Sequence, residues 1–567
     1  MTDFYIAKNG TSGGTGTISD PVQTVAQVLA LSNFINPATQ HTIIFRAGTY
    51  DTEIDTDNTT QYQLKLTGLA EACNLKGYEG ETVIFKPVND VQYLCSLVSI
   101  ANNTGNEITL TIENIQFENN GSNEVGNAFI RMDSASNAAT KVNTNVKNCT
   151  FTQDDGDVDL LVGCTYFGSA AIQGSDVTIS DCTFNFHSRR CIHINTLKGL
   201  AIIKNNTINV TSPTLMAAND ADKLLFIAKP NNYAVDSTVK LEDNKFIYNL
   251  SSFNTDGDLI QLDYINNIVV SNNSFEINPA AGVTTQDVGP LKNIIKIFNS
   301  ATGVDPSHVN RDLKTLNISS NIAIRNDTRG MFVELSGTAS LDTASSFSGS
   351  VLNVDSNVIV ATNDLIRESS IEGSFIKVTK SPMETIKIKN NFISGLPDGI
   401  ILKRGGEGSV TVENNVFDNM GRDGAGSYSE ARAIEFLNVG TSSNPVQVRK
   451  NIFNIGELHT CLFLSGSSDT SHVNVEENTF MCPEFRSTSS SIFAMHYSSS
   501  GTESQHTFKN NYYLNTENLN ATSIGVVGGV NKTLAQLEGL ETTLHTNNLV
   551  KRTKGGLIKK PIKLLGT

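Results

Sequence analysis

The chain has 567 residues, of which 17% are charged, and its formal net charge is −15. This acidic balance argues against a general nucleic-acid-binding protein, because such proteins need a basic face that displaces counterions from phosphate. No apolar run reaches the roughly 18 residues of a membrane span, and the opening residues show neither the basic nor the apolar region of a secretion signal. With 43 glycines and 13 prolines, the composition is typical of a polar, turn-rich β protein.

The first predicted element is a short helix. Residues 21–33, PVQTVAQVLALSN, carry apolar side chains at helical spacing. A repetitive fold leaves its core open at each end and needs a cap there. We therefore expect residues 1–50 to form an amino-terminal cap and the first structural unit.

An eight-residue pattern then recurs along most of the chain: apolar, any, apolar, any, polar, Asn, any, apolar. Its first and third positions alternate with period two, which indicates a strand with one buried face. Successive copies end between 24 and 48 residues apart, so one bare unit has about 24 residues. The copies are 110–117, 144–151, 177–184, 201–208, 239–246, 268–275, 316–323, 352–359, 386–393, 410–417, 446–453, 473–480 and 506–513.

The sixth position of the pattern determines the fold class. It holds Ile115, Cys149, Cys182 and then ten Asn residues, namely Asn206, Asn244, Asn273, Asn321, Asn357, Asn391, Asn415, Asn451, Asn478 and Asn511. Buried amides need partners, and identical Asn side chains stacked about 4.8 Å apart can bond one another. A series of antiparallel hairpins would give no such column. The pattern predicts an all-β, right-handed parallel β-helix of about 13 coils with three strands per coil, an internal Asn ladder and short helical caps.

The residue before each ladder position is often Asn or Asp, which suits a left-handed turn. A second row of strands precedes the pattern in several coils. Its segments are 127–134, 190–196, 258–264, 293–299, 331–337, 374–380, 399–405 and 432–438. Their predicted outward side chains form a polar stripe on which an extended polymer can lie: Arg131, His193, Gln261, Asp263, Lys296, Glu334, Lys377, Lys403 and Glu435.

The eight cysteines show no CxxC motif and no paired metal spacing, so we expect reduced, packing cysteines. We expect the β-helix to span residues 51–515 and a carboxy-terminal cap with a basic tail to span 516–567. Within the latter, residues 533–540 suggest a short helix. Residues 550–563 are basic and are either solvated or dock onto a partner.

Both ends of the chain resemble a known superfamily. Residues 3–21, DFYIAKNGTSGGTGTISDP, and 41–50, HTIIFRAGTY, resemble the first coil of pectate-lyase-like β-helices, especially the chondroitinase B and alginate lyase group, polysaccharide lyase family six. Residues 510–520 and 533–550 look like the end of the same superfamily. The resemblance implies a carbohydrate substrate and extends to phage tailspike-type β-helices.

The same resemblance implies a catalytic pair. In that family a strand-end Lys acts as base and an Arg one coil later acts as acid or charge stabiliser, and these positions correspond to Lys380 and Arg404. Lys377 and Lys403 extend the basic patch. The acidic calcium ligands of the family fall on Gly373 and Phe375, so we expect no metal and no cofactor.

The sequence is compatible with three functions. The first is a virion-borne tailspike or tail-fibre protein that binds, and in one version depolymerises, a host surface polysaccharide. The second is a calcium-independent lyase for an acidic glycan, and the third is an inert structural spike. Glycoside hydrolysis would need two nearby carboxylates, such as Asp263 with Glu242 or Glu334 with Glu368. The first function implies an extracellular or virion-tail location, a homotrimer and other tail proteins as partners, without nucleic acid or membrane insertion.

Overall fold

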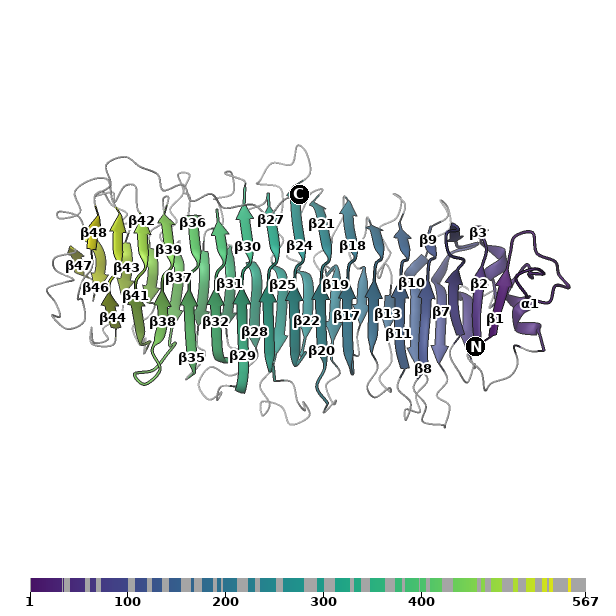
Figure 1. The fold of residues 1–567 in the computed structure, drawn as a ribbon, viewed down its shortest axis with the longest axis horizontal. Coiled ribbons are helices and arrows are strands. Elements are labelled where there is room, and N and C mark those ends of the chain that lie inside the picture. Colours follow the sequence, from purple (N-terminus) through teal and green to yellow (C-terminus); the bar gives the residue numbers. More distant parts are fainter. Residues whose placement is uncertain are drawn as a thin grey trace.

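The fold is that of a computed structural model. It describes residues 2–32, 34, 41–56, 62–67, 73–99, 108–119, 125–134, 142–153, 165–167, 176–186, 191–194, 197–211, 223–229, 235–250, 258–279, 293–299, 312–326, 331–337, 347–362, 373–379, 383–396, 398–403, 408–420, 432–455, 460–464, 471–481, 493–497, 506–514, 523–527, 530–533 and 549–551. Within these ranges the chain winds through three long sheets of sixteen strands each, which lie side by side along one axis (Figure 1).

Sheet 1 carries the first half of the repeated pattern. It consists of β1 (Thr2–Ile6), β2 (His41–Phe45), β5 (Cys73–Gly77), β8 (Ile108–Glu113), β11 (Val142–Lys147), β14 (Val177–Ser180), β17 (Leu200–Lys204), β20 (Thr238–Glu242), β23 (Asn267–Ser271), β26 (Thr315–Ser319), β29 (Phe347–Asp355), β32 (Met383–Lys389), β35 (Ser409–Glu413), β38 (Val446–Arg449), β41 (Val473–Glu476) and β44 (His506–Lys509). The thirteen copies of the pattern start in β8 and its followers, and three further strands precede them.

Sheet 2 contains the second row of strands expected from the sequence. It consists of β4 (Tyr62–Thr67), β7 (Val91–Ser99), β10 (Val125–Ser134), β13 (Thr165–Phe167), β16 (Ile192–Ile194), β19 (Leu225–Ala228), β22 (Asp258–Asp263), β25 (Asn293–Asn299), β28 (Met331–Gly337), β31 (Ser374–Thr379), β34 (Asp398–Lys403), β37 (Arg432–Leu437), β40 (Thr460–Leu464), β43 (Phe493–Tyr497), β46 (Ser523–Val527) and β47 (Val530–Thr533).

Sheet 3 carries the end of the pattern. It consists of β3 (Gly48–Tyr50), β6 (Val83–Phe85), β9 (Gln116–Glu118), β12 (Thr150–Thr152), β15 (Thr183–Phe186), β18 (Thr207–Thr211), β21 (Lys245–Leu250), β24 (Ser274–Pro279), β27 (Ile322–Arg325), β30 (Val358–Ala361), β33 (Phe392–Ser394), β36 (Val416–Met420), β39 (Ile452–Ile455), β42 (Thr479–Met481), β45 (Tyr512–Leu514) and β48 (Leu549–Lys551).

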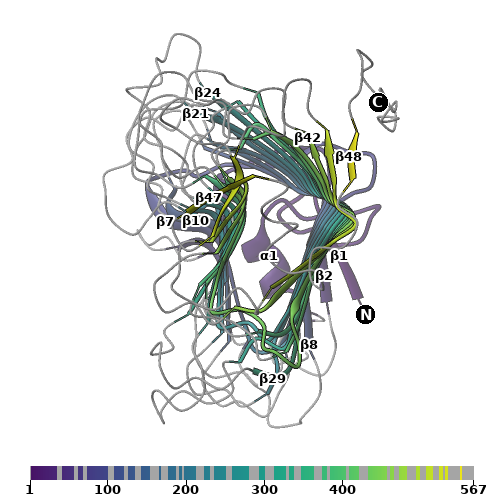
Figure 2. The same ribbon diagram turned by 90° about the vertical axis from the view of Figure 1, so that its left-hand side faces the viewer.

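The order of the strands establishes the fold. From β4 to β46, the chain visits sheet 2, sheet 1 and sheet 3 in turn, and each strand pairs in parallel with its counterpart one coil away. Such crossover connections are right-handed in nearly all proteins. Seen along its axis, the molecule is a tube with the three sheets as its walls (Figure 2). The chain is a right-handed parallel β-helix, as its sequence predicts.

The corner between sheet 1 and sheet 3 has the same conformation in each copy of the pattern. The residue before each ladder position has a positive φ between 50° and 59°, from Asn114 in the first copy to Asn510 in the last. Asn and Asp tolerate this left-handed region best, yet Ser320, Lys450 and Glu477 also adopt it. The packed corner therefore outweighs the local preference of the residue.

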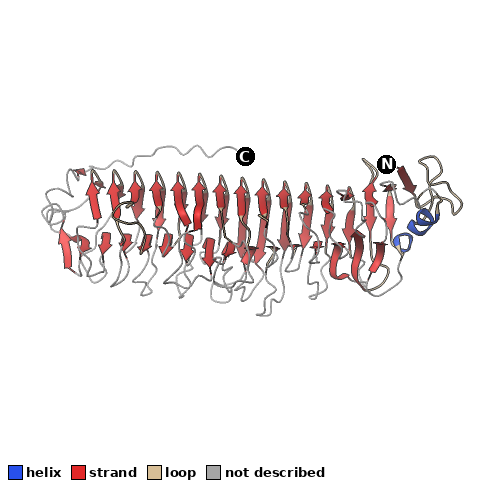
Figure 3. Ribbon diagram, turned by 90° about the horizontal axis from the view of Figure 1, so that it is seen from below, coloured by secondary structure: helices blue, strands red, loops and turns tan. Residues whose placement is uncertain are grey.

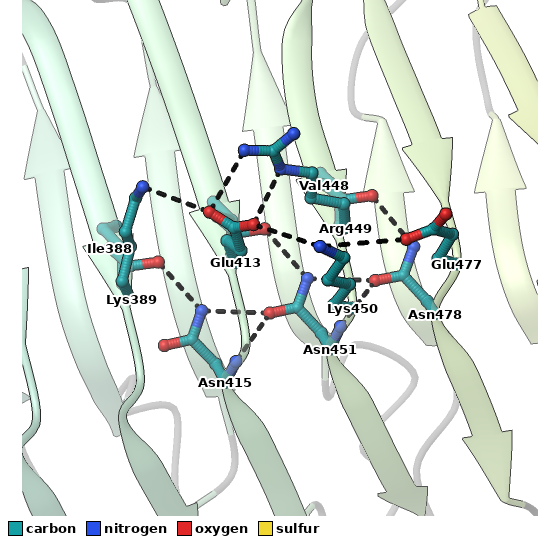
Figure 4. Close-up of polar contacts among 11 residues, drawn as sticks. Ile388, Lys389, Glu413, Asn415, Val448, Arg449, Lys450, Asn451, Glu477 and Asn478 are labelled. Atoms are coloured by element: carbon teal, nitrogen blue, oxygen red, sulfur yellow. Dashed lines mark hydrogen bonds and ion pairs between the residues drawn. The ribbon is translucent and has the colours of Figure 1, made fainter.

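The ten ladder Asn residues are buried and form one column, which confirms the prediction. Between Asn451 and Asn478, for example, both the backbone N–H and Nδ2 of Asn451 donate to Oδ1 of Asn478, at 2.9 and 3.0 Å (Figure 4). Nδ2 of Asn451 also donates to the backbone carbonyl of Val412 at 2.9 Å. The same bonds join each ladder Asn to the next, so the column satisfies amide groups that burial would otherwise leave costly.

Apolar side chains fill the tube inside the ladder. Phe117, Phe151 and Phe184 stack almost parallel, with ring centroids 5.0 and 4.9 Å apart, because each occupies the same position one strand later. A similar stack lies further along the tube and consists of Phe417, Phe453 and Phe480. The parallel register thus produces columns of like residues in the core.

The amino-terminal end is closed by α1 (Val25–Ala30), within the predicted range 21–33 (Figure 3). A capping box joins Thr24 to Gln27, and Val25 and Val28 are buried against the first coil. A short 3-10 helix, η1 (Thr52–Ile54), lies beside α1. At the other end β46 and β47 pair antiparallel. Thr533, the first residue of the predicted second helix, ends β47, and the rest of that segment is outside the described residues.

Six cysteines lie in the described ranges and are free and buried: Cys73, Cys95, Cys149, Cys182, Cys191 and Cys461. They pack as small apolar residues, as the absence of a CxxC motif predicts. Cys149 and Cys182 occupy the second and third ladder positions, after Ile115, and donate weakly to backbone carbonyls. Among the described residues, no helix is both long enough and apolar enough to cross a membrane.

We predict that Asn391→Leu lowers the free energy of unfolding. Oδ1 of Asn391 accepts two bonds from Asn357, and its Nδ2 donates to Asn415, so the substitution leaves buried groups without partners in both neighbouring coils. Each such group costs about 1–3 kcal/mol. Urea unfolding measures the loss. Lys387→Leu, an exposed site on the same coil, is the control and should change stability by about 0.5 kcal/mol or less. Equal effects of the two substitutions would contradict a stabilising ladder.

Candidate functional site

The outward polar stripe predicted on sheet 2 is present as a row of residues in register. Between β10 and β37 the row contains Arg131, Tyr166, His193, Phe226, Gln261, Lys296, Glu334, Lys377, Ile401 and Glu435. We call these residues the sheet-2 row. Strand spacing of about 4.8 Å places each member beside the next, so the row runs from strand to strand along the tube.

Two predicted members of the stripe lie in a neighbouring row. Asp263 pairs with Phe298, and Lys403 pairs with Thr379, each two residues further along its strand than the sheet-2 row. At β34 the sheet-2 row holds Ile401 instead. A period of two keeps both rows on the same face of the sheet. Lys403 and Asp263 therefore border the sheet-2 row rather than belong to it.

The row is only partly accessible. Phe226, Lys296, Glu334 and Lys377 are partly exposed. His193, Gln261 and Glu435 were also expected to face solvent, yet they are only 7%, 8% and 4% exposed. Their immediate neighbours pack over them, as the contacts described next show.

Two carboxylates, Asp258 beside the sheet-2 row and Glu334 within it, are joined by Asn293 near the middle of the row. Nδ2 of Asn293 donates to Oδ1 of Asp258 at 2.5 Å and to Oε2 of Glu334 at 3.0 Å. Nζ of Lys296 lies 3.4 Å from Oδ2 of Asp258. Because the two carboxylate oxygens bond one nitrogen, they are less than about 5.5 Å apart, so the two carboxyl groups are close neighbours, as are the paired carboxyl groups of retaining glycosidases.

Asn293 is central to this group and is fully buried. Its Nδ2 makes both bonds to the carboxylates, whereas its Oδ1 has no hydrogen-bond partner. Oδ1 of Asn293 therefore remains as an acceptor beside the two carboxylates, which a further hydrogen-bond donor could use.

Asp263 lies beside the same group. Nε2 of Gln261 donates to both of its carboxylate oxygens, at 2.8 and 2.9 Å. Burial raises the pKa of Asp263 above its ordinary value, and the negative charge of Asp258 acts in the same direction, although the bond from Gln261 and the charges of Lys223 and Lys296 oppose both. A carboxyl group with a raised pKa keeps its proton to higher pH than an ordinary Asp.

An aromatic contact extends the row toward the amino terminus. The rings of His193 and Phe226 meet edge to face with centroids 5.0 Å apart, and Nζ of Lys223 lies 5.0 Å from the centroid of Phe226. The contact presents a partly exposed aromatic surface next to hydrogen-bonding groups.

At the other end of the row, Glu435 is held by two cations. Nζ of Lys403 lies 3.2 Å from Oε1 of Glu435, and Nη1 of Arg432 lies 2.8 Å from its Oε2. The backbone N–H of Arg432 also donates to Oδ1 of Asp398 at 3.0 Å. Lys403, which was expected to extend a basic patch, is therefore engaged in an ion pair.

The predicted catalytic pair, Lys380 and Arg404, lies outside the described residues, as does Glu368. The alternative pairing of Asp263 with Glu242 joins side chains from different sheets, because Glu242 ends β20 of sheet 1. Sequence reasoning missed Asp258, Asn293 and Phe226. Asp258 and Asn293 are each the first residue of a predicted strand. A carboxyl or amide side chain at equivalent positions of two neighbouring coils was the sequence feature that could have identified them.

Sheet 1 offers charged residues of a different kind. Glu413 is buried and contacts Lys389 at 3.1 Å and Arg449 at 2.9 Å, as Figure 4 shows together with Lys450. Burial would raise the pKa of Glu413, but its bonds to Lys389 and Arg449 outweigh this and lower it. Such mutually satisfied charges hold adjacent coils together and present no unpaired group to a ligand.

A shallow hollow of about 650 Å³ lies on the same sheet near the amino terminus. Its lining residues include Asn74, Lys76, Tyr78 and Glu113. It is separate from the sheet-2 row. Within the described ranges, no three His, Cys, Asp or Glu side chains are placed together so that they could hold a metal ion.

No protein-family model and no curated protein sequence matches the chain. Solved structures similar to it include the pectate lyase Pel9A, with 11% identity, a TM-score of 0.28 and coverage of 69% of this chain and 78% of that one. A GH136 lacto-N-biosidase from Eubacterium ramulus has 11% identity, a TM-score of 0.33 and coverage of 84% and 68%. A mannuronic-acid-specific polysaccharide family 6 lyase from human gut microbiota has 10% identity, a TM-score of 0.28 and coverage of 98% and 92%.

Identities and scores of this size carry no argument about chemistry. The strand order and pairing in the chain itself establish the right-handed parallel β-helix.

We predict that Asp263→Asn gains stability relative to the unsubstituted protein as the pH rises. The raised pKa means that Asp263 favours folding when protonated, and this contribution is lost as the pH rises through the pKa of the folded state. Asn never ionises and avoids that loss. Urea unfolding at about pH 4, near the ordinary Asp pKa, and again at pH 7 should show the larger relative gain at pH 7. A gain in the free energy of unfolding that is the same at both pH values, or larger at pH 4, would contradict a raised pKa for Asp263.

Proposed function

We propose that the sheet-2 row binds an extended polysaccharide. The observation that carries this proposal is the alignment, on consecutive strands, of side chains that suit sugar rings. Phe226 offers an apolar ring face, whereas Lys296, Glu334 and Lys377 offer hydrogen bonds and charge. A polymer that runs along the tube would meet these groups at regular intervals of about 4.8 Å.

Cations and carboxylates alternate in the central part of the row, where Lys296 lies between Asp258 and Glu334. A strongly acidic glycan would meet both attraction and repulsion there. Neutral sugars would use the same groups as donors and acceptors. A basic patch at Lys377, Lys380 and Arg404 would shift the preference toward acidic polysaccharides. Binding measured against an array of neutral and acidic polysaccharides shows which of the two classes is the ligand.

The biological setting is part of the proposal. A rigid solenoid with a binding row along its length suits a spike that reaches a cell-surface polysaccharide, and we place the chain outside the cell, as a homotrimeric component of a virion tail with other tail proteins as partners. Light scattering of the purified chain tests the trimer, and antibody labelling of purified particles tests the location. A monomer, or particles without label, would count against this setting.

We predict that Phe226→Ala and Lys296→Ala each weaken binding to the polysaccharide selected from the array by roughly two- to tenfold, because aromatic contacts and single polar contacts contribute about 0.5–1.5 kcal/mol. Calorimetry measures the affinity. Lys387→Ala removes an exposed cation from sheet 1 and should leave binding unchanged. An affinity lowered equally by all three substitutions would indicate a nonspecific effect of charge or folding.

A second function, hydrolysis of the bound polysaccharide, is favoured by the carboxylates around Asn293. Asp258 pairs with Lys296 and would attack the anomeric carbon. No cation lies within ion-pair distance of Glu334 among the described residues, and it would protonate the leaving glycosidic oxygen. Water activated by Glu334 would then release the sugar from Asp258.

We predict that Asp258→Asn and Glu334→Gln each lower the rate of chain cleavage by at least about a hundredfold while affinity stays within a few-fold, since general acid and nucleophile act in the transition state. New reducing ends report hydrolysis, and ultraviolet absorbance of unsaturated uronate ends reports the lyase alternative. Lys380→Ala and Arg404→Ala test that alternative. Unsaturated products that disappear in the latter two variants would refute hydrolysis.

A further inference from the structure

Sheet 3 has an exposed apolar row on its outer surface. Five residues on consecutive strands are in register: Ile322, Val358, Phe392, Val416 and Ile452. Ile322 is 48% exposed and Ile452 is 36% exposed, and the three between them are partly exposed. Ile324, which is 42% exposed, lies two residues after Ile322. Three of the five large apolar residues that are exposed within the described ranges thus lie on this one surface.

The apolar row is confined to part of the sheet. In earlier coils the same position holds Thr150, Thr183 and Thr207, which suit a strand that faces water. The change from Thr to large apolar residues occurs by β27 and persists through β39. Contiguous apolar surface of this kind marks an interaction site in soluble proteins.

The chain itself supplies a segment that fits this surface. The last described strand, β48, pairs with β45 at the end of sheet 3, so the chain leaves the described structure on the same sheet. Residues 552–567, RTKGGLIKKPIKLLGT, follow. Fully extended, they span about 53 Å. β27 lies seven strands from β48, or about 34 Å, so the segment can cover the whole row.

The chemistry of the segment is complementary to that of the surface. Leu557, Ile558, Ile562, Leu564 and Leu565 are apolar residues that need burial. The segment also has five Lys or Arg residues and no acidic residue, whereas the whole chain has a net charge of −15. Asp418, two residues after Val416, lies beside the apolar row and is partly exposed.

We propose that residues 552–567 dock onto the apolar row of sheet 3 in the same molecule. The apolar side chains of the segment cover the row between β39 and β27, and its cations face Asp418 and water. Pro561 lacks an N–H and suits a segment that packs through side chains on the face of a sheet rather than one that adds a strand to its edge. Docking would cover sheet 3 and leave the sheet-2 row open, so this inference does not depend on the proposed function.

Cross-linking tests the proposal directly. Ile558 lies seven residues after Lys551, a reach of about 23 Å, and Val416 lies four strands from β48, or about 19 Å. The double variant Ile558→Cys with Val416→Cys is treated with a short bismaleimide at low protein concentration. Peptide mapping by mass spectrometry identifies the 416–558 link separately from the native cysteines. Ile558→Cys with Thr150→Cys is the control, because Thr150 lies about 58 Å from β48, beyond reach.

We predict a 416–558 link in protein of monomer mass and no 150–558 link. A 416–558 link found only between two molecules would overturn the proposal and assign the surface to a second copy. The absence of any 416–558 link would also overturn it.

A binding measurement keeps the test independent of the cysteine variants. A synthetic peptide of residues 552–567 should bind the chain truncated after Lys551 and should bind the full chain at least about tenfold more weakly, because its own segment occupies the site. Val416→Lys in the truncated chain should weaken peptide binding by at least about tenfold, whereas Thr207→Lys, at the same row position in the Thr region, should not. Equal peptide binding by the truncated and full chains would contradict docking within one molecule.

Discussion

The Asn ladder is the interaction on which the rest of the structure depends. Oδ1 of a ladder Asn accepts from both the backbone N–H and Nδ2 of the ladder Asn one coil before it, so every coil must repeat its corner at the same height and angle. This constraint fixes the register of sheets 1 and 3 on either side of the corner. Residues with little preference for a left-handed backbone, such as Lys450 and Glu477, adopt it there because the coils above and below require it.

A repeated register has consequences beyond stability. Because equivalent residues stack one strand apart, a side-chain type that recurs in the sequence becomes a continuous row in space. Phenylalanines become stacks in the core, alternating charges become ion pairs on sheet 1, and polar and aromatic residues become the sheet-2 row. The insertions that lengthen some coils leave the corner unchanged, since they enter away from it.

The two candidate surfaces differ in how they use this regularity. On sheet 2, residues from three strands converge on Asn293, whose unpaired oxygen and two carboxylate partners distinguish it from the satisfied charges around Glu413. On sheet 3, a row that holds Thr in early coils is apolar from Ile322 through Ile452. The first surface is suited to a hydrated polymer and the second to an apolar segment.

The sequence by itself determined the fold class, the ladder residues, the left-handed corner and eight of the sixteen strands of sheet 2, because each depends on a local pattern repeated at coil intervals. Only the tertiary structure showed that Asn293 joins Asp258 to Glu334, that His193 and Glu435 are buried, and that Lys403 is ion-paired. These facts depend on side-chain directions and on burial across strands whose contacting residues are 32 or more residues apart in the chain. A residue pattern specifies which row a side chain enters, but the packing of neighbouring coils decides whether it meets solvent or a partner.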